Sequence, residues 1–407
     1  MTKEKPTEPR LRFPGFTDAW KQRKLGECFL ERVERSAEGE LLSVTISDGV
    51  RRFSDLDRKD NSSEDKANYK VLRQGDIVYN SMRMWQGASG YSRYDGIVSP
   101  AYTVLIPTEI SHALFFSYLF KKSSLLQLFQ VNSQGLTSDT WNLKYKPFSH
   151  IVVPSPILPE QEAIGSFFSD LDQLITLHQR KLDDVKELKK ALLQKMFPKG
   201  NGNDFPELRF PEFTDAWKQR KLGEVATFAK GNGYSKKDLV IKGSPIILYG
   251  RLYTKYETVI SEVDTFVSVE DNKNSVVYSE GGEVLVPASG ESSLDIARAS
   301  VVAKKGIILG GDINIIRLHS EIFPVFLALT ISNGKQQKGL SKRAQGKSVV
   351  HLHNSDLKKV DLDFPTLPEQ EAIGNFFSDL DQLITLHQRQ LDHLKLLKKA
   401  LLQQMFI

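Results

Sequence analysis

The chain has 407 residues, 40% of them hydrophobic and 26% charged, with a formal net charge of +5. This composition is typical of a globular protein of two or three domains, and so small a charge excludes binding of nucleic acid by bulk charge alone. The longest apolar run, 113–120, is too short to span a bilayer, and the first ten residues lack the apolar core of a secretory signal. A single cysteine, Cys28, excludes an internal disulfide, so we expect a cytoplasmic protein.

Two internal repeats divide the chain into constant and variable segments. The sequence LRFPGFTDAWKQRKLGE at 11–27 recurs at 208–224 with one difference, Gly15 against Glu212. The segment 158–197 recurs at 367–406 with 34 of 40 positions identical, whereas 28–157 and 225–366 show no comparable identity. A simple duplication is one interpretation, but duplicates usually drift everywhere. We therefore expect the variable segments to be the parts that meet a ligand.

The two variable segments show the same order of elements. In the first, a strand at 76–81, a Gly/Ser loop at 82–96 and a strand at 99–107 lead to a helix around 111–130. In the second, a strand and Gly/Ser loop at 281–293, a strand at 310–318 and a helix at 321–337 follow one another. Each segment then has a loop with SQG (133–135) or AQG (344–346) and a last strand, 150–156 or 360–365. This order predicts two α+β domains.

The constant segments predict two long amphipathic helices, 159–197 and 368–406. Apolar residues recur at alternating steps of four and three, as in helices that pack on one another. They are Ile164, Phe168, Leu171, Ile175, Leu182 and Val185, and in the copy Ile373, Phe377, Leu380, Ile384, Leu391 and Leu394. Each helix would be on the order of 55 Å long, so we expect the two to pair, antiparallel, with the domains at opposite ends. His178 and His387 would then meet, which we interpret as histidines tolerated at a seam and not as a metal site.

The loops of the variable segments concentrate side chains suited to DNA. Arg hydrogen-bonds guanine and Gln or Asn hydrogen-bonds adenine, while Ser and Lys hold phosphates. In the first domain the candidate DNA-binding residues are Arg83, Trp85, Gln86, Ser89, Tyr91, Arg93, Asn132, Ser133, Thr137 and Ser138. In the second they are Lys230, Asn232, Tyr234, Arg251, Tyr253, Ser289, Ser292, Arg298, Lys342, Arg343 and Lys347. For any one of them, a solvated loop side chain is the alternative interpretation.

Sites for chemistry are hard to find in the sequence. No [ND]PP[YF] motif of an amino-methyltransferase occurs, and GLSKRAQGKS at 339–348 has Ser341 where a phosphate loop needs glycine. The HLH at 351–353 is half a metal site at most, and no acid pair or nucleophile triad can be assembled. We therefore predict a recognition protein with no catalytic residue, metal or cofactor of its own.

Two unlike domains, each followed by a near-identical LPEQEAIG…FFSDLDQLITLHQR helix, resemble the specificity subunit of a type I restriction–modification enzyme. The resemblance implies target-recognition domains at 1–157 (junction 11–27, variable 28–157) and 200–366 (junction 208–224, variable 225–366). It implies spacer helices at 158–199 and 367–407, forming an antiparallel coiled coil in a pseudo-twofold, circular molecule.

The same resemblance implies partners. Double-stranded DNA with an asymmetric bipartite target, two methyltransferase subunits and, for restriction, two motor-nuclease subunits would bind. Adenine-N6 methylation and ATP-dependent cleavage, with S-adenosylmethionine, ATP and Mg, would belong to those subunits. Joining the C-terminal end to the N-terminus would regenerate the helix-to-domain junction, in which we expect Trp20 and Trp217 to anchor each domain against a helix end. The alternatives are a non-catalytic scaffold that binds protein partners and, less well supported, a stand-alone methyltransferase.

Overall fold

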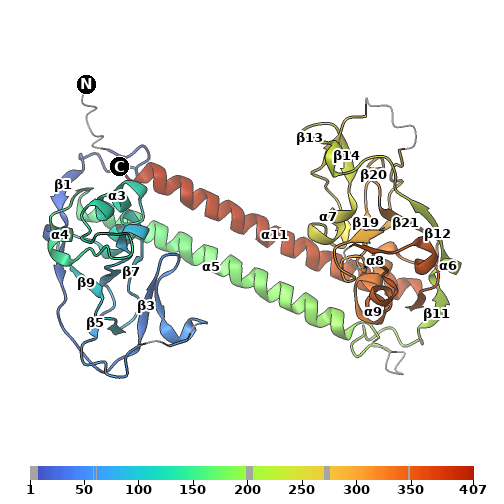
Figure 1. Cartoon of the computed structure of the whole chain (residues 1–407), viewed down its shortest axis with the longest axis horizontal. Coiled ribbons are helices and arrows are strands. Elements are labelled where there is room, and N and C mark those ends of the chain that lie inside the picture. Colours follow the sequence, from blue (N-terminus) through green and yellow to red (C-terminus); the bar gives the residue numbers. More distant parts are fainter. Residues whose placement is uncertain (1–7, 58, 61, 199–204, 270–275, 347–348) are drawn as a thin grey trace. The chain divides into compact units, whose positions relative to one another are not determined.

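The computed structural model describes residues 8–57, 59–60, 62–198, 205–269, 276–346 and 349–407 (Figure 1). The chain forms two compact units: unit 1 comprises Met1–His178 with Gln390–Ile407, and unit 2 comprises Gln179–Arg389. Each unit contains strands and helices, as the sequence predicts. Among the described helices, none is both long and apolar enough to cross a membrane.

Unit 1 is built around the antiparallel sheet β2-β9-β6-β7. Its central strand β6 alternates between two cores, because Ile77 and Tyr79 face the larger cluster while Val78 faces a smaller one with Val104. The elements are β1 (Lys21–Lys24), α1 (Leu25–Cys28), β2 (Phe29–Glu31), β3 (Leu42–Thr45), β4 (Gly49–Arg52), η1 (Phe53–Asp55), β5 (Lys70–Leu72), β6 (Ile77–Asn80), η2 (Met84–Gln86), β7 (Ser89–Tyr91), β8 (Gly96–Val98), β9 (Tyr102–Pro107), α2 (Ala113–Leu119), α3 (Ser123–Val131), α4 (Tyr145–Ser149) and β10 (Val152–Ser155).

Unit 2 is built around the five-stranded sheet β12-β21-β17-β19-β15, with a smaller sheet β13-β16-β14-β20. Strand β17 alternates in the same way, with Val284 and Val286 in one core and Leu285 in another. The elements are β11 (Lys218–Lys221), α6 (Leu222–Val225), β12 (Ala226–Lys230), η3 (Lys236–Asp238), β13 (Leu239–Val240), β14 (Ser244–Ile247), α7 (Tyr249–Thr254), β15 (Val259–Ile260), β16 (Phe266–Val267), β17 (Val284–Pro287), β18 (Ser289–Gly290), β19 (Ser300–Val302), β20 (Ile308–Leu309), β21 (Ile313–Leu318), α8 (Pro324–Ser332), α9 (Gly334–Arg343), β22 (Val350–His351), α10 (Asn354–Leu357) and β23 (Asp361–Phe364).

The two long helices are α5 (Leu158–Lys195) and α11 (Leu367–Met405), which confirms both predicted helices. Segments of both helices take part in each unit. In unit 1, Phe168 packs on Phe406 at 5.8 Å between ring centroids, and Asp172 pairs with Lys398 at 2.5 Å. In unit 2, Phe377 packs on Phe197 at 6.3 Å and Asp381 pairs with Lys189. Within each unit the two helical segments therefore run in opposite directions.

The duplicated sequence builds the same junction in both units. In unit 1, Arg12 donates to both carboxylate oxygens of Glu160 at 2.7 Å, and in unit 2 Arg209 donates to Glu369 at 2.6 Å. Both glutamates are fully buried, so each ion pair fixes the start of a long helix against its domain.

The end of the other helix completes each junction. Trp20 packs edge-on against Phe406 near the end of α11, and Trp217 packs edge-on against Phe197 after the end of α5, at 6.5 Å in each case. This confirms that Trp20 and Trp217 anchor each domain against a helix end. The Leu11 amide donates to the carbonyl of Gln404 as the Leu208 amide donates to Lys195, both at 3.0 Å, although only the second pair is linked by nearby chain.

Both helices predicted within the variable segments are in fact broken in two. The prediction of one helix around 111–130 is wrong because Lys122 has an extended backbone between α2 and α3. The prediction of one helix at 321–337 is wrong because Asn333 is extended and Gly334 has φ +64° between α8 and α9. The first break falls at two lysines, Lys121 and Lys122, and at the second the apolar helix α8 gives way to the polar helix α9.

Candidate nucleic-acid interface

In unit 1 the two predicted recognition loops lie side by side. The rings of Trp85, in η2, and Trp141 meet edge to face with centroids 5.1 Å apart. The Leu143 amide donates to the carbonyl of Ser81 at 2.8 Å, and Gln134 and Asn142 exchange backbone hydrogen bonds. The fold thus brings the loop with Arg83, Trp85 and Gln86 next to the loop 132–142. Trp141 was not among the predicted residues, although an aromatic residue in a polar loop was a usable sign.

The predicted residues of these two loops differ in availability. Arg83, Thr137 and Ser138 are exposed, and Gln86 is half-buried. Asn132 and Ser133 are already engaged, because their side chains donate to the carbonyls of Leu128 and Phe129 in α3 at 2.8 and 2.7 Å. These two residues therefore close the C-terminal turn of the helix before the loop.

Lys121 holds the loop of unit 1 that contains η2 by hydrogen bonds to backbone carbonyls. Its ammonium donates to the carbonyls of Ser89 at 2.8 Å, Ile46 at 3.3 Å and Gly87. These carbonyls belong to β7, to the β3–β4 hairpin and to the residue after η2. Burial, with a smaller contribution from nearby Lys398, lowers the pKa of Lys121 to about 8. One buried side chain thereby joins the segment that follows η2 to a neighbouring hairpin.

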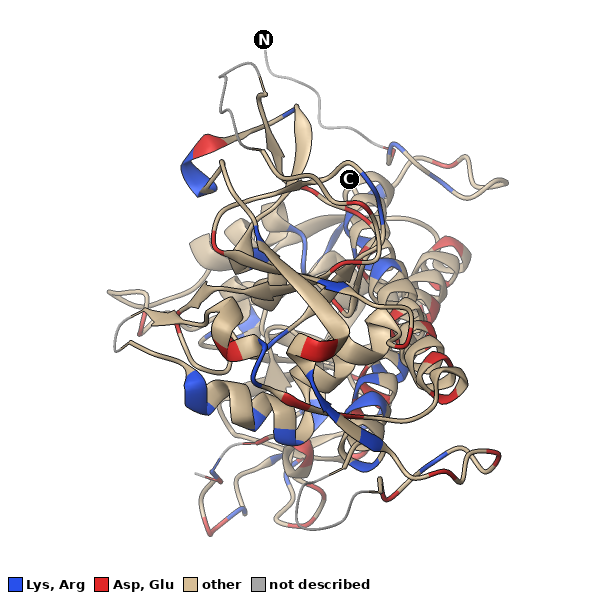
Figure 2. Ribbon diagram, turned by 90° about the vertical axis from the view of Figure 1, so that its right-hand side faces the viewer, with Lys and Arg blue, Asp and Glu red and all other residues tan. Residues whose placement is uncertain are grey.

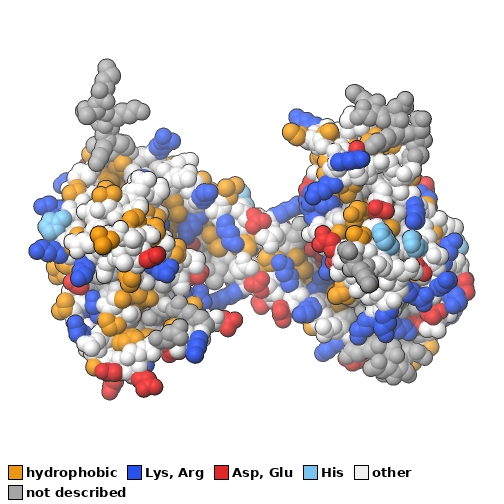
Figure 3. Space-filling model, in the orientation of Figure 1, with side chains coloured by type: hydrophobic (Ala, Val, Ile, Leu, Met, Phe, Trp, Pro, Cys, Tyr) orange, Lys and Arg blue, Asp and Glu red, His pale blue; other side chains and the backbone are white. Residues whose placement is uncertain are grey.

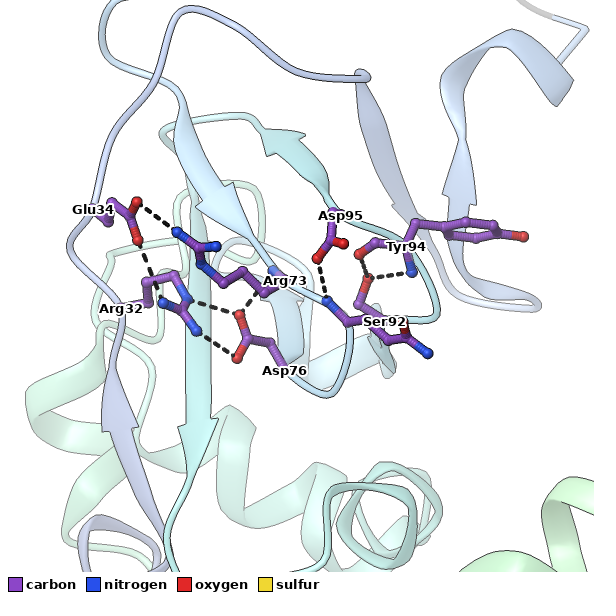
Figure 4. A network of polar contacts seen from close by, with 8 residues as sticks. Arg32, Glu34, Arg73, Asp76, Ser92, Tyr94 and Asp95 are labelled. Carbon is purple, nitrogen blue, oxygen red and sulfur yellow. Dashed lines mark hydrogen bonds and ion pairs between the residues drawn. The ribbon is translucent and has the colours of Figure 1, made fainter.

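A polar network holds the turn before β6 (Figure 4). Arg32 forms a two-pronged bond to the buried carboxylate of Asp76, at 2.8 and 3.0 Å, and this raises the pKa of Arg32. Glu34 accepts from Arg32 at 3.5 Å and from Arg73 at 2.9 Å. The carboxylate of Asp76 also accepts from the Arg73 amide at 2.9 Å, which closes the turn.

The neighbouring loop 92–95, which carries Arg93, is tied to the same turn (Figure 4). The backbone amide of Gln74 donates to the carboxylate of Asp95 at 2.9 Å, and the Ser92 hydroxyl donates to the carbonyl of Tyr94 at 2.7 Å. Arg93 is exposed and donates to the Ser169 hydroxyl of α5 at 2.9 Å, while Tyr91 is half-buried at the edge of the main core. The guanidinium of Arg93 is therefore presented at the start of the long helix on a fixed loop.

Unit 2 brings its loops together by the corresponding contacts. The Leu352 amide donates to the carbonyl of Ala288 at 2.9 Å, matching Leu143 and Ser81 in unit 1. Strands β18 and β22 pair antiparallel, and the side chains of Ser289 and His351 share a hydrogen bond of 3.0 Å. The loop after β17 thus lies against the segment that follows α9. The last residues of α9 are Lys342 and Arg343.

Other predicted residues of unit 2 lie around these loops. Lys230 is exposed at the end of β12, where the carbonyl of Ala229 accepts from Asn354 at 3.0 Å. Helix α7, which contacts β18, carries Arg251, paired with Asp264 at 3.2 Å, and Tyr253. Burial raises the pKa of Tyr253, and Glu291 contributes to the same shift. Arg298, Asn232 and Ser292 are exposed, and the Ser292 hydroxyl donates to Asp295 at 2.7 Å.

Three of the predicted contact residues have interior side chains. Ser89 is 0% exposed in β7, Tyr234 is 3% exposed in a small core with Ile246 and Leu248, and Ser289 is 4% exposed in β18. The loop composition that drew attention to them is the composition of strand ends packed beneath a loop. Lys347 lies outside the described residues.

The histidines of HLH have structural partners. His351 shares its hydrogen bond with Ser289, and His353 forms a capping box with Asp356 at the start of α10. Within the described part of the chain, no group of three or more His, Cys, Asp or Glu side chains could hold a metal ion.

Basic side chains gather on α9 of unit 2. This ten-residue helix carries Lys335, Lys338, Lys342 and Arg343, which Figure 2 shows as blue segments where unit 2 faces the viewer. Lys335 pairs with Asp363, whereas the other three form no ion pair with any residue that the structure describes. In Figure 3 a cluster of basic side chains covers the position of α9. Such a face is complementary to phosphate groups.

The chain is similar to known proteins over most of its length. A family model described as "Type I restriction modification DNA specificity domain" matches residues 20–187 and 214–396. The MjaVIII type I restriction enzyme specificity subunit of Methanocaldococcus jannaschii is 21% identical over 82% of this chain and 78% of its own length. The putative MjaX specificity subunit of the same organism is 22% identical over 88% and 84%.

A solved structure has the same fold. The crystal structure of the type I restriction–modification system S subunit from M. genitalium aligns over 98% of this chain and 99% of that chain, with a TM-score of 0.63 at 15% identity. The family model matches twice and covers most of the residues, once in each half of the chain. The chain therefore belongs to the family of type I restriction–modification specificity subunits.

Proposed function

We propose that the chain is the DNA-recognition subunit of its complex and binds an asymmetric target in two parts. The observation that carries this proposal is that two nearly identical junctions support two unlike sets of loops. Trp85 and Trp141 meet in unit 1, whereas β18 and β22 pair in unit 2. Identical domains would favour a palindrome, and unlike domains favour two different half-sites.

The candidate contacts are the exposed or half-buried residues of these loops together with Trp141. In unit 1 they are Arg83, Trp85, Gln86, Tyr91, Arg93, Thr137, Ser138 and Trp141, and in unit 2 Lys230, Asn232, Arg251, Tyr253, Ser292, Arg298, Lys342 and Arg343. Arg and Gln suit base edges, aromatic rings pack on the bases or sugars, and Lys suits phosphates.

The chain is divided, in this proposal, into recognition domains 1–157 and 200–366 and spacer helices 158–199 and 367–407. The helices form an antiparallel coiled coil in a pseudo-twofold, circular molecule. The opposite directions of the helical segments within each unit support this arrangement, as does the repetition of the Arg12–Glu160 pair by Arg209–Glu369.

The partners follow from the two junctions. Two equal surfaces suit two copies of a methyltransferase subunit, and two motor-nuclease subunits join for restriction. S-adenosylmethionine, ATP and Mg then serve adenine-N6 methylation and cleavage on those subunits, in the cytoplasm. A net charge of only +5 fits a subunit whose partners enclose part of the DNA.

Methylome sequencing of a host that carries this chain with its methyltransferase subunit tests the proposal. We expect one motif with two unlike halves around unspecified bases. Replacing 28–157 with another variable segment should change one half only, and the matched replacement of 225–366 should change only the other. An undivided or palindromic motif contradicts the proposal. Absence of any preferred duplex for the purified complex would favour a protein-binding scaffold.

A further inference from the structure

Unit 2 contains a cavity of about 670 Å³, and Arg298 is the one residue of its described lining that is also a candidate DNA contact. This volume lies within the range of small-molecule sites. The walls come from the last turns of α5, the segment 252–258 that begins in α7, the segment 298–300 before and within β19, and the break between α8 and α9.

Basic side chains dominate the charge of this cavity. Helix α5 contributes Lys186, Lys189 and Lys190, and the other walls contribute Arg298 and Lys338. The acidic residue in the lining is Glu257. Lys189 is neutralised by Asp381 and lies 3.7 Å from Glu257. The other four form no ion pair with any residue in the described ranges. Like charges around a concave surface repel one another, so an anion in the cavity would lower the energy.

The first turn of α9 adds donors to the same cavity. Asn333, Gly334 and Gln337 line it at the point where this ten-residue helix begins. The first amide groups of a helix lack intrahelical acceptors, and its N-terminus favours negative charge. Together with the basic side chains, this arrangement suits phosphate groups.

The remaining wall is apolar and aromatic. Phe197, Leu252 and Leu329 line it, together with Tyr256. The side chain of Tyr256 is half-buried, and its pKa is raised chiefly by burial, while a hydrogen bond with Thr265 opposes the shift. A planar ring with polar edges fits such a wall, as phosphates fit the basic one.

The corresponding place in unit 1 is occupied by larger side chains. The backbone amide of His112, before α2, donates to the side-chain oxygen of Gln161 at 2.8 Å, and the backbone amide of Phe323, before α8, donates to that of Gln370 at 2.9 Å. Because Gln161 and Gln370 are repeated positions, His112 corresponds to Phe323, and this aligns α2 with α8. By this alignment Leu329 takes the place of Tyr118, and Ser332 and Asn333 take the places of Lys121 and Lys122.

These larger residues are engaged in unit 1. Tyr118 donates to Asp172 at 2.8 Å and lies 5.3 Å from Lys398, while Lys122 donates to the carbonyl of Phe406 at 2.7 Å. In unit 2 the aligned positions hold the smaller residues Leu329, Ser332 and Asn333, and all three line the cavity.

We propose that this cavity binds a free nucleoside phosphate. Lys186, Lys190, Arg298, Lys338 and the first turn of α9 hold the phosphates, and the base lies against Tyr256 and Leu329. Arg298 is also a candidate DNA contact, whereas Lys186, Lys190 and Lys338 are not, so the test relies on residues that the proposed recognition of DNA does not use.

Calorimetric titration of the full chain with ADP, adenosine and pyrophosphate tests the site. We expect one saturable site for ADP, weaker binding of pyrophosphate and none of adenosine. The double variant Lys186→Gln with Lys190→Gln should weaken ADP binding by roughly tenfold or more, because two charge-assisted bonds are lost. Leu329→Tyr, which restores the bulk found in unit 1, should also abolish binding while leaving every charge in place.

The matched control is Lys395→Gln with Lys399→Gln, the same change at the repeated positions of α11 in unit 1. It should leave ADP binding unchanged, and thermal melting checks that all variants fold. Equal loss of binding in this control, or no saturable binding of ADP to the wild-type chain, contradicts the proposal. Displacement of ADP by a duplex, with the same variants weakening the duplex equally, would assign the cavity to the DNA backbone and also overturn it.

Discussion

Lys121 shows how a single buried charge can position a loop. Its ammonium serves three carbonyls, and its pKa falls from 10.5 to about 8 because burial disfavours the charged form. At pH 9 the unfolded side chain keeps its proton while the folded one has largely lost it. Stability therefore rises with pH between these two values, by up to about 3 kcal/mol.

We expect Lys121→Met to remove this rise. Urea unfolding at pH 7, 8, 9 and 10 measures the free energy of unfolding for both proteins. The difference between wild type and variant should grow with pH, because only the wild type sheds the cost of the buried charge. Asp48, which opposes the shift, and Lys398, which adds to it, are present in both proteins and so cancel in the comparison. Parallel pH profiles would show that Lys121 does not titrate in this range.

At the scale of elements, the long helices approach their domains at two glycines. A Cβ on Gly165 of α5 would lie 2.8 Å from the Phe115 amide nitrogen, and one on Gly374 of α11 would lie 2.5 Å from the Phe323 ring. Alanine normally stabilises a helix interior by about 1 kcal/mol over glycine. Here we expect Gly165→Ala to destabilise by roughly 1–3 kcal/mol, because the backbone of α2 cannot move aside easily.

Gly339 of α9 provides the control, because a Cβ there meets nothing within 4 Å. Gly339→Ala should raise the melting temperature and Gly165→Ala should lower it, as measured by scanning calorimetry. Gly374→Ala should fall between them, since a ring can rotate where a backbone cannot. A stabilising Gly165→Ala would mean that α5 and α2 are not held in close contact.

The same elements show which parts of the fold are predictable from sequence. Helices α5 and α11 were predictable because their apolar period continues over ten turns without a break. The break at Asn333 was not, because α8 is apolar on every side and carries no periodic face whose end could be recognised. The burial of Ser89 and Ser289 was not predictable for a related reason, since Gly/Ser composition describes both a loop and the buried strand end beneath it. The cavity of unit 2 was invisible because its walls come from four distant segments of the chain.

At the scale of the whole molecule, one junction has a covalent link that the other lacks. Twelve residues, 196–207, separate Lys195 from Leu208, and the backbone amide of Leu208 donates to the carbonyl of Lys195 at 3.0 Å. If Ile407 were joined directly to Thr2, Met405–Ile407 and residues 2–10 would also place twelve residues between Gln404 and Leu11. These two residues already meet at the same distance, so the fusion needs no added linker.

We therefore expect a circular permutant, with Ile407 fused to Thr2 and the chain opened between 203 and 204, to fold with both junctions intact. Its melting temperature should stay close to that of the wild type, because the opened and closed links are equivalent in length and in the contacts they flank. Its methylome motif, read with the methyltransferase subunit, should be unchanged. A permutant that shortens the fused link by deleting 2–7 is the control, and it should melt lower because six residues in place of twelve strain the contact of Phe406 with Trp20. Loss of folding in the direct fusion, with the shortened one no worse, would show that the two junctions are not equivalent.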